Sequence, residues 1–127
     1  MSIPDHYIPG VCNIGPAETR ARRMFGWGGS AAAVILAGAL MAGGAPAPWR
    51  LLVFFPASLG ATGFLQAGMH FCAGYGMRAL SNFGPLGGKA DTVEQAEFRA
   101  LDRRKAQSIF AWSLSLGVAA AVIATVI

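Results

Sequence analysis

Three long stretches of the chain contain no charged residue: residues 24–49, 51–77 and 106–127. A helix rises about 1.5 Å per residue and the hydrocarbon core of a bilayer is about 30 Å thick, so about 20 residues suffice to cross it. The first stretch exceeds the apolar part of a signal peptide, which has about 7–15 residues. We therefore predict an all-α integral membrane protein with three transmembrane helices.

Prolines and glycines between these stretches divide one membrane domain, residues 1–127, into segments. Pro16 suits a first helical turn, and Glu18 close to it complements the helix dipole. Breakers then cluster at residues 46–48 and 84–88. The predicted segments are a cytoplasmic arm at 1–15, helix 1 at 16–45, helix 2 at 49–76, a cytoplasmic loop at 77–91, and an amphipathic segment with helix 3 at 92–127.

The segment 92–105 carries the features of a short amphipathic cytoplasmic helix before the third span. Thr92 and Gln95 have the spacing of a capping box. Apolar side chains such as Ala100 and Leu101 recur with a helical period, while the acidic residues, including Asp102, share a solvated face with arginines. We expect this segment to lie along the membrane surface or to extend the third span.

Composition supports the membrane class. The hydrophobic share is 54% and the charged share only 13%, against about 25% in an average soluble domain. The net charge of +4 does not indicate nucleic acid binding, because the basic residues lie at the ends of the spans. There they can meet anionic lipid headgroups, so we expect anionic lipid as a partner and bound lipid in the protein.

The placement of basic and aromatic residues predicts an orientation. All lysines and arginines except Arg50 lie in the first and third polar segments. The positive-inside rule then places the N-terminus in the cytoplasm and the C-terminus outside, in a bacterial inner membrane. The expected interface anchors are Arg22, Arg23, Trp27, Trp49, Arg103, Arg104 and Trp112.

Small residues recur at four-residue intervals in all three spans, a pattern that lets helix backbones approach closely. They are Gly29, Ala33 and Ala37 in the first, Gly63 and Ala67 in the second, and Ser113, Gly117 and Ala121 in the third. Three helices cannot bury all of these faces against one another. We expect some to contact other integral membrane subunits or further copies of the chain.

A polar stripe runs along the second span at i, i+4 intervals and consists of Ser58, Thr62, Gln66 and His70. It could line a homo-oligomeric pore or a path for a small solute. Alternatively, it supplies hydrogen bonds between helices, each worth about 0.6 kcal/mol. No span contains Asp, Glu, Lys or Arg, which argues against a proton-coupled pump.

His70 could also be an axial ligand of a haem-like or chlorophyll-like macrocycle, because small residues around it leave a smooth helix surface. Together with His6, Cys12 and Cys72 it provides the residue types of a zinc site, although no pair has zinc-finger spacing. Both cysteines fall on the predicted cytoplasmic side, where we expect free thiols.

Catalytic motifs are missing from the sequence, including the nucleophile elbow, the HExxH pair and the P-loop. We therefore predict that the chain is not an enzyme. The preferred hypothesis is a small accessory or structural subunit of a larger membrane complex. It would act through helix packing and a cytoplasmic docking surface. A protein that binds a cofactor or metal through His70, Cys72 and Cys12 is the alternative.

Overall fold

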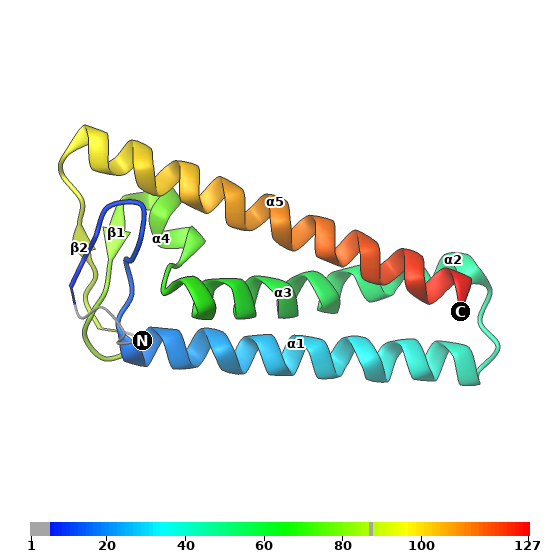
Figure 1. The fold of residues 1–127 in the computed structure, drawn as a ribbon. Helices are drawn as coiled ribbons and strands as arrows, with labels where there is room; N and C mark the ends of the chain where they lie inside the picture. Colours follow the sequence, from blue (N-terminus) through cyan, green and yellow to red (C-terminus); the bar gives the residue numbers. More distant parts are fainter. Residues whose placement is uncertain (1–5, 87) are drawn as a thin grey trace.

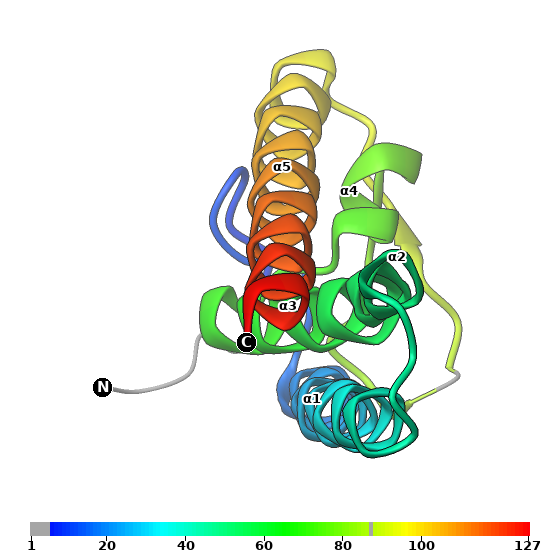
Figure 2. The same ribbon diagram turned by 90° about the vertical axis from the view of Figure 1, so that its right-hand side faces the viewer.

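The computed structural model describes residues 6–86 and 88–127, in which three long helices lie side by side. The middle helix, α3, lies between α1 and α5 (Figures 1 and 2). The helices are α1 (Pro16–Ala42), α2 (Ala47–Arg50), the 3-10 helix η1 (Leu51–Val53), α3 (Phe54–Met69), α4 (Ala73–Arg78) and α5 (Ala96–Val126), and the strands are β1 (Leu80–Ser81) and β2 (Asp91–Thr92).

Three helical segments are long and apolar enough to cross a membrane: Pro16–Ala42, Ala47–Met69 and Ala96–Val126. Their number agrees with the three predicted spans, and α1 starts at Pro16 with Glu18 in its first turn, as expected. The structure buries only 17% of the most apolar window of the first segment and 28% in each of the others. Most of the helix surface therefore faces outward.

The prediction of one continuous helix over 49–76 is wrong at its C-terminal end. Helix α3 stops at Met69, and His70 takes the left-handed conformation with φ 54°. Cys72 is extended, and α4 starts only at Ala73. No proline causes this break. Contacts from elsewhere in the chain stabilise it, as described below.

The start of the third long helix also differs from the prediction. Thr92 does not begin a helix, because it pairs with Leu80 in the antiparallel ladder of β1 and β2. Helix α5 begins at Ala96 and continues without interruption to Val126. Residues 96–105 are therefore the first turns of α5, which matches the expected alternative that this segment extends the third span, whereas a separate amphipathic helix is not confirmed.

The polar segments come together at one end of the bundle, which we call the arm end (Figure 1). It consists of the arm (residues 6–15), α4, the two strands and the first turns of α5. Ile14 forms a parallel bridge with Asn82, so the arm adds to the hairpin. A small core of Phe71, Ala73, Ala106 and Ile109 lies beneath it. The opposite end, where α2 and η1 connect α1 to α3, we call the turn end.

Candidate functional site

Glycines mediate the contact between α1 and α3. A Cβ added at Gly29 would overlap the backbone of Gly60, and one added at Gly63 would overlap the backbone of Gly26. Ala67 of α3 is also buried, with 1% of its surface exposed. Such close approach of backbones is how small residues hold membrane helices together.

The small-residue face of α5 packs against α3. A Cβ at Gly117 would overlap the Ser58 hydroxyl, and both Ser113 and Ala121 are buried. Ala33 and Ala37 of α1 are only half-buried. They line an apolar hollow of about 240 Å³ between α1 and α5 near the turn end. The predicted faces of α3 and α5 thus pack within the chain, whereas on α1 only Gly29 does so and Ala33 and Ala37 stay partly open.

The polar stripe on α3 makes its contacts inside the chain. Thr62 Oγ1 donates to the Ser58 carbonyl at 2.7 Å, and Gln66 Oε1 accepts from the Ala73 backbone N–H at 2.9 Å. The Ser58 Oγ is buried and has no hydrogen-bond partner among the described residues. Gln66 therefore bridges the break between α3 and α4.

His70 lies at this break rather than on a regular helix. Its carbonyl accepts from the Asn13 backbone N–H at 3.2 Å. Its Nδ1 atom is buried and finds no hydrogen-bond partner in the described part of the chain. His70 thus lies just beyond the regular helix that carries Ser58, Thr62 and Gln66.

Asn13 of the arm, which the sequence analysis did not single out, stabilises the break directly. Its Oδ1 accepts from the Cys72 N–H at 2.7 Å, and its Nδ2 donates to the Cys72 carbonyl at 3.1 Å. Asn13 is fully buried. Backbone groups that a broken helix leaves unpaired must find partners inside the protein, and one side chain here satisfies both groups of a residue.

Cys72 also contacts an ion pair within the first turns of α1. Arg22 Nη2 lies 2.9 Å from Glu18 Oε2 and 3.2 Å from Cys72 Sγ. Glu18 is 2% exposed. Arg22, predicted to anchor the protein at the headgroups, is therefore half-buried and engaged within the chain.

The metal-ligand candidates do not form a site in the structure. Cys12 and Cys72 are free, as expected, and both are buried. Burial raises the pKa of the Cys12 thiol, which donates to the Ile14 carbonyl at 3.4 Å. His6 is exposed at the start of the described arm. Within residues 6–86 and 88–127, no group of three or more His, Cys, Asp or Glu side chains could hold a metal ion.

Asp102 is fully buried, so its predicted place on a solvated face is wrong. Its Oδ2 accepts from the Tyr7 hydroxyl at 2.5 Å, and its Oδ1 accepts from the Gly10 N–H at 2.8 Å. Burial, and then the bond to Asp102, raise the pKa of Tyr7 above its usual range. A sequence signal existed: Asp102 precedes Ala106 by one turn and continues the buried face of α5.

The remaining predicted interface anchors point outward. Trp27, Trp49 and Trp112 are each more than half exposed, and Arg23, Arg103 and Arg104 are exposed as well. Arg50, at the turn end, donates to the carbonyls of Ala124 at 3.5 Å and Ile127 at 3.2 Å. A cation suits the C-terminal end of a helix such as α5.

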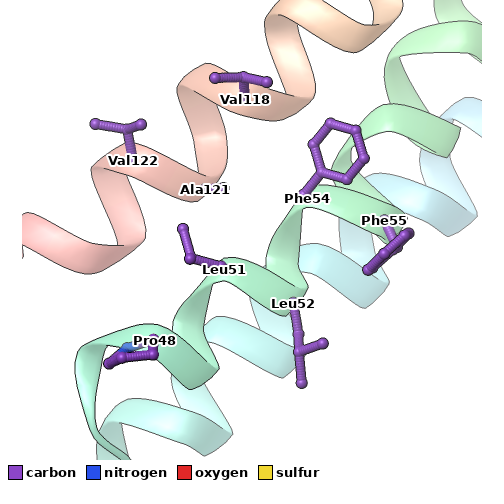
Figure 3. Close-up of a pocket in the computed structure, with 8 residues that line it drawn as sticks. All are labelled: Pro48, Leu51, Leu52, Phe54, Phe55, Val118, Ala121 and Val122. Carbon is purple, nitrogen blue, oxygen red and sulfur yellow. The ribbon is translucent and has the colours of Figure 1, made fainter.

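Two apolar grooves are open on the bundle surface. One, of about 370 Å³, lies between α5 and the segment from α2 to α3 at the turn end (Figure 3). The other, of about 440 Å³, runs between α1 and α3. Gly28, Gly29 and Ala32 belong to its lining, together with bulky side chains such as Phe25 and Leu59.

The outward face of α1 is unusually bare. A Cβ added at Gly28 or at Gly38 would meet no described atom within 4 Å. Gly28 and Ala32 lie four residues apart, a spacing of small residues that lets membrane helices approach closely. The function must be inferred from such features, because comparison with protein-family models, curated proteins and solved structures gives no match.

Proposed function

We propose that this chain is a small accessory or structural subunit of a larger membrane assembly. The assembly is formed with other membrane-spanning chains or with further copies of this one. The observation that supports the proposal most strongly is the second small-residue face of α1, which carries Gly28 and Ala32 and which no described residue covers. The partner on this face is a membrane helix.

The reasoning follows from how membrane helices associate. Lipid tails are as apolar as leucine, so helices associate through close backbone packing and not through the hydrophobic effect. On one side of α1, Gly26 and Gly29 already allow such packing against α3. On the adjoining face, Gly28 and Ala32 offer small residues four apart beside a groove with bulky walls. This combination fits the ridge of a neighbouring helix.

The arm end supplies the second part of the proposal. The arm contacts both α5 and the hairpin and so forms a structured surface, around which Arg20, Arg23 and Lys89 are exposed. The excess of basic residues favours a cytoplasmic position for this end. In a bacterial inner membrane it would then present a docking surface to soluble parts of the assembly.

A bulky substitution at Gly28 tests the subunit proposal. Gly28→Leu should leave the fold intact, because the added side chain enters open space, and should separate the chain from its neighbours. Native mass spectrometry after extraction in mild detergent would report the assembly directly. Ala119→Leu is the matched control, since Ala119 is a small exposed residue of α5.

The expected result is a complex of defined mass for the unmodified chain and for Ala119→Leu, and a lone monomer for Gly28→Leu. If the unmodified chain itself is a lone monomer in mild detergent, the subunit proposal is lost. An unchanged complex in Gly28→Leu would move the contact away from this face of α1.

A second candidate, cofactor binding by His70, is supported by one observation. Its Nδ1 is buried without a described partner, and such an atom can serve as a ligand for a metal ion or a macrocycle. An absorbance spectrum and metal analysis of the purified protein test this candidate. Loss of a bound chromophore or metal in His70→Ala would support it, whereas a colourless, metal-free protein would remove it.

A further inference from the structure

A shallow hollow lies where the arm crosses α5, near the first turns of that helix. Residues 9–11 of the arm form one wall, and Leu101, Arg104, Lys105 and Ser108 of α5 form the other. Its volume is about 390 Å³, within the range of about 300–1,000 Å³ that is usual for small-molecule sites. No acidic side chain lines it.

The two cations of this hollow have no partner among residues 6–86 and 88–127. Neither Arg104 nor Lys105 makes a hydrogen bond or an ion pair with any described residue. The neighbouring carboxylate of Asp102 is buried, and its two oxygens are occupied by Tyr7 and Gly10. The hollow therefore concentrates positive charge that the chain itself leaves uncompensated.

Other cations on the same surface differ in this respect. Arg99 Nη1 donates to backbone carbonyls at Val93 and Glu94, and Arg78 Nε donates to the Gly74 carbonyl. Arg103 is exposed but does not line the hollow. At Arg104 and Lys105, two cations without a described partner line the same concave surface.

The position of the hollow along α5 indicates the kind of ligand. Lys105 is the last charged residue before the apolar run 106–127, so the hollow lies where the helix changes from charged to apolar. Val11 and Leu101 beside it are 51% and 46% exposed. A ligand that fits must combine a negative headgroup with an apolar tail that continues along α5.

We propose that this hollow binds the headgroup of one anionic phospholipid. The phosphate diester accepts hydrogen bonds from the Arg104 guanidinium, the Lys105 ammonium and the Ser108 hydroxyl. A guanidinium suits two phosphate oxygens at once, and an ammonium adds a compact charge. The acyl chains follow the apolar part of α5. The proposal requires only that α5 spans the membrane and is independent of the subunit function.

Native mass spectrometry of the protein in nanodiscs of mixed phosphatidylcholine and phosphatidylglycerol tests this site. The unmodified chain should retain one phosphatidylglycerol in preference to phosphatidylcholine. R104Q/K105Q should lower that retention at least tenfold. R103Q/K89Q loses the same number of charges outside the hollow and should stay within twofold of the unmodified chain.

A second variant protects the test against a folding defect. Val11→Asp adds a negative charge at an exposed position of the hollow and should also lower retention, with the thermal unfolding midpoint unchanged. Equal retention in R104Q/K105Q, or an equal loss in R103Q/K89Q, would overturn the proposal. Inorganic phosphate at millimolar concentration should not displace the lipid; complete displacement would assign the hollow to a free anion instead.

Discussion

The arm end and the helix bundle are stabilised in different ways. At the arm end the backbone is irregular, and buried polar side chains such as Asn13, Gln66 and Asp102 provide its hydrogen bonds. In the bundle the backbone is regular and satisfies itself, and contacts between glycines bring the helices together. Side-chain hydrogen bonds therefore fix the backbone where helices break. Where helices continue, glycines set how closely the helices approach one another.

The two regions also differ in how fully their groups find partners within the chain. Polar groups of the arm end mostly find partners within the chain, apart from the cations on its surface and the His70 ring. The bundle, in contrast, leaves a small-residue face of α1 and two apolar grooves uncovered. An outside partner is therefore expected along the bundle, and an anionic headgroup at the arm end.

The largest effect should follow from a bulky residue in the α1 and α3 contact. Gly63→Leu must push the two backbones apart and should destabilise the protein by about 3 kcal/mol or more, at the upper end of overpacking costs. Gly68→Leu, on the same helix but facing open space, should change stability by less than about 1 kcal/mol. Reversible unfolding in detergent measures both. Equal effects would contradict the glycine contact.

Removal of the Asn13 side chain should have the next largest effect. Asn13→Ala leaves the buried Cys72 N–H without its acceptor, at about 1–3 kcal/mol, whereas the Cys72 carbonyl still accepts from the Gly76 N–H. Asn13→Asp keeps the acceptor for the N–H and should lose only part of this stability. Hydrogen exchange at residues 70–73 reports the opening. Unchanged exchange in Asn13→Ala would show that the arm does not stabilise the break.

A smaller effect is expected at the contact between the arm and α5. Tyr7→Phe removes one hydrogen bond to the Asp102 carboxylate and should cost about 1.5 kcal/mol, the lower end for bonds to charged groups. Cys12 is a buried residue of the arm, so its alkylation should become faster in Tyr7→Phe. Tyr75→Phe serves as the control and should leave the alkylation rate unchanged. The same rate in all three proteins would contradict the contact.

The smallest effect is a change in the pH dependence of stability. The pKa of Tyr7 is raised, chiefly by burial, so the folded state favours the neutral phenol. The stabilisation is complete below pH ~10, the usual tyrosine pKa, and is lost as the pH rises through the higher folded-state pKa. The difference in alkaline absorbance between the unmodified chain and Tyr7→Phe measures this ionisation. A midpoint near pH ~10 would contradict the burial.

The sequence predicts the regular part of this molecule well. Charge-free length is sufficient to identify a span, and the three long helices follow from it. Within each span, small residues recur every four positions. This spacing identifies residues at which the helices touch, including Gly29, Gly63 and Gly117. These features are local or periodic, so they can be read without knowing the fold.

The irregular part could not be predicted in the same way. Asn13 stabilises the break at His70 through its contact with Cys72, which lies 59 residues away in the chain. No local sequence pattern predicts a contact between residues so far apart. Asp102 lies on the periodic buried face of α5, but its charge is typical of a surface residue, and the hydrogen-bond partners that make its burial favourable come from the arm. Contacts of this kind are set by tertiary structure and not by helical periodicity.

A photo-crosslinking amino acid at Ala32, compared with one at Ala119, tests most directly whether the open face of α1 meets a partner. Both positions are small and exposed, but only Ala32 lies in the groove beside Gly28. In native membranes, position 32 should give an adduct with one polypeptide of defined mass, and position 119 only lipid adducts. Lipid adducts alone at both positions would contradict the account.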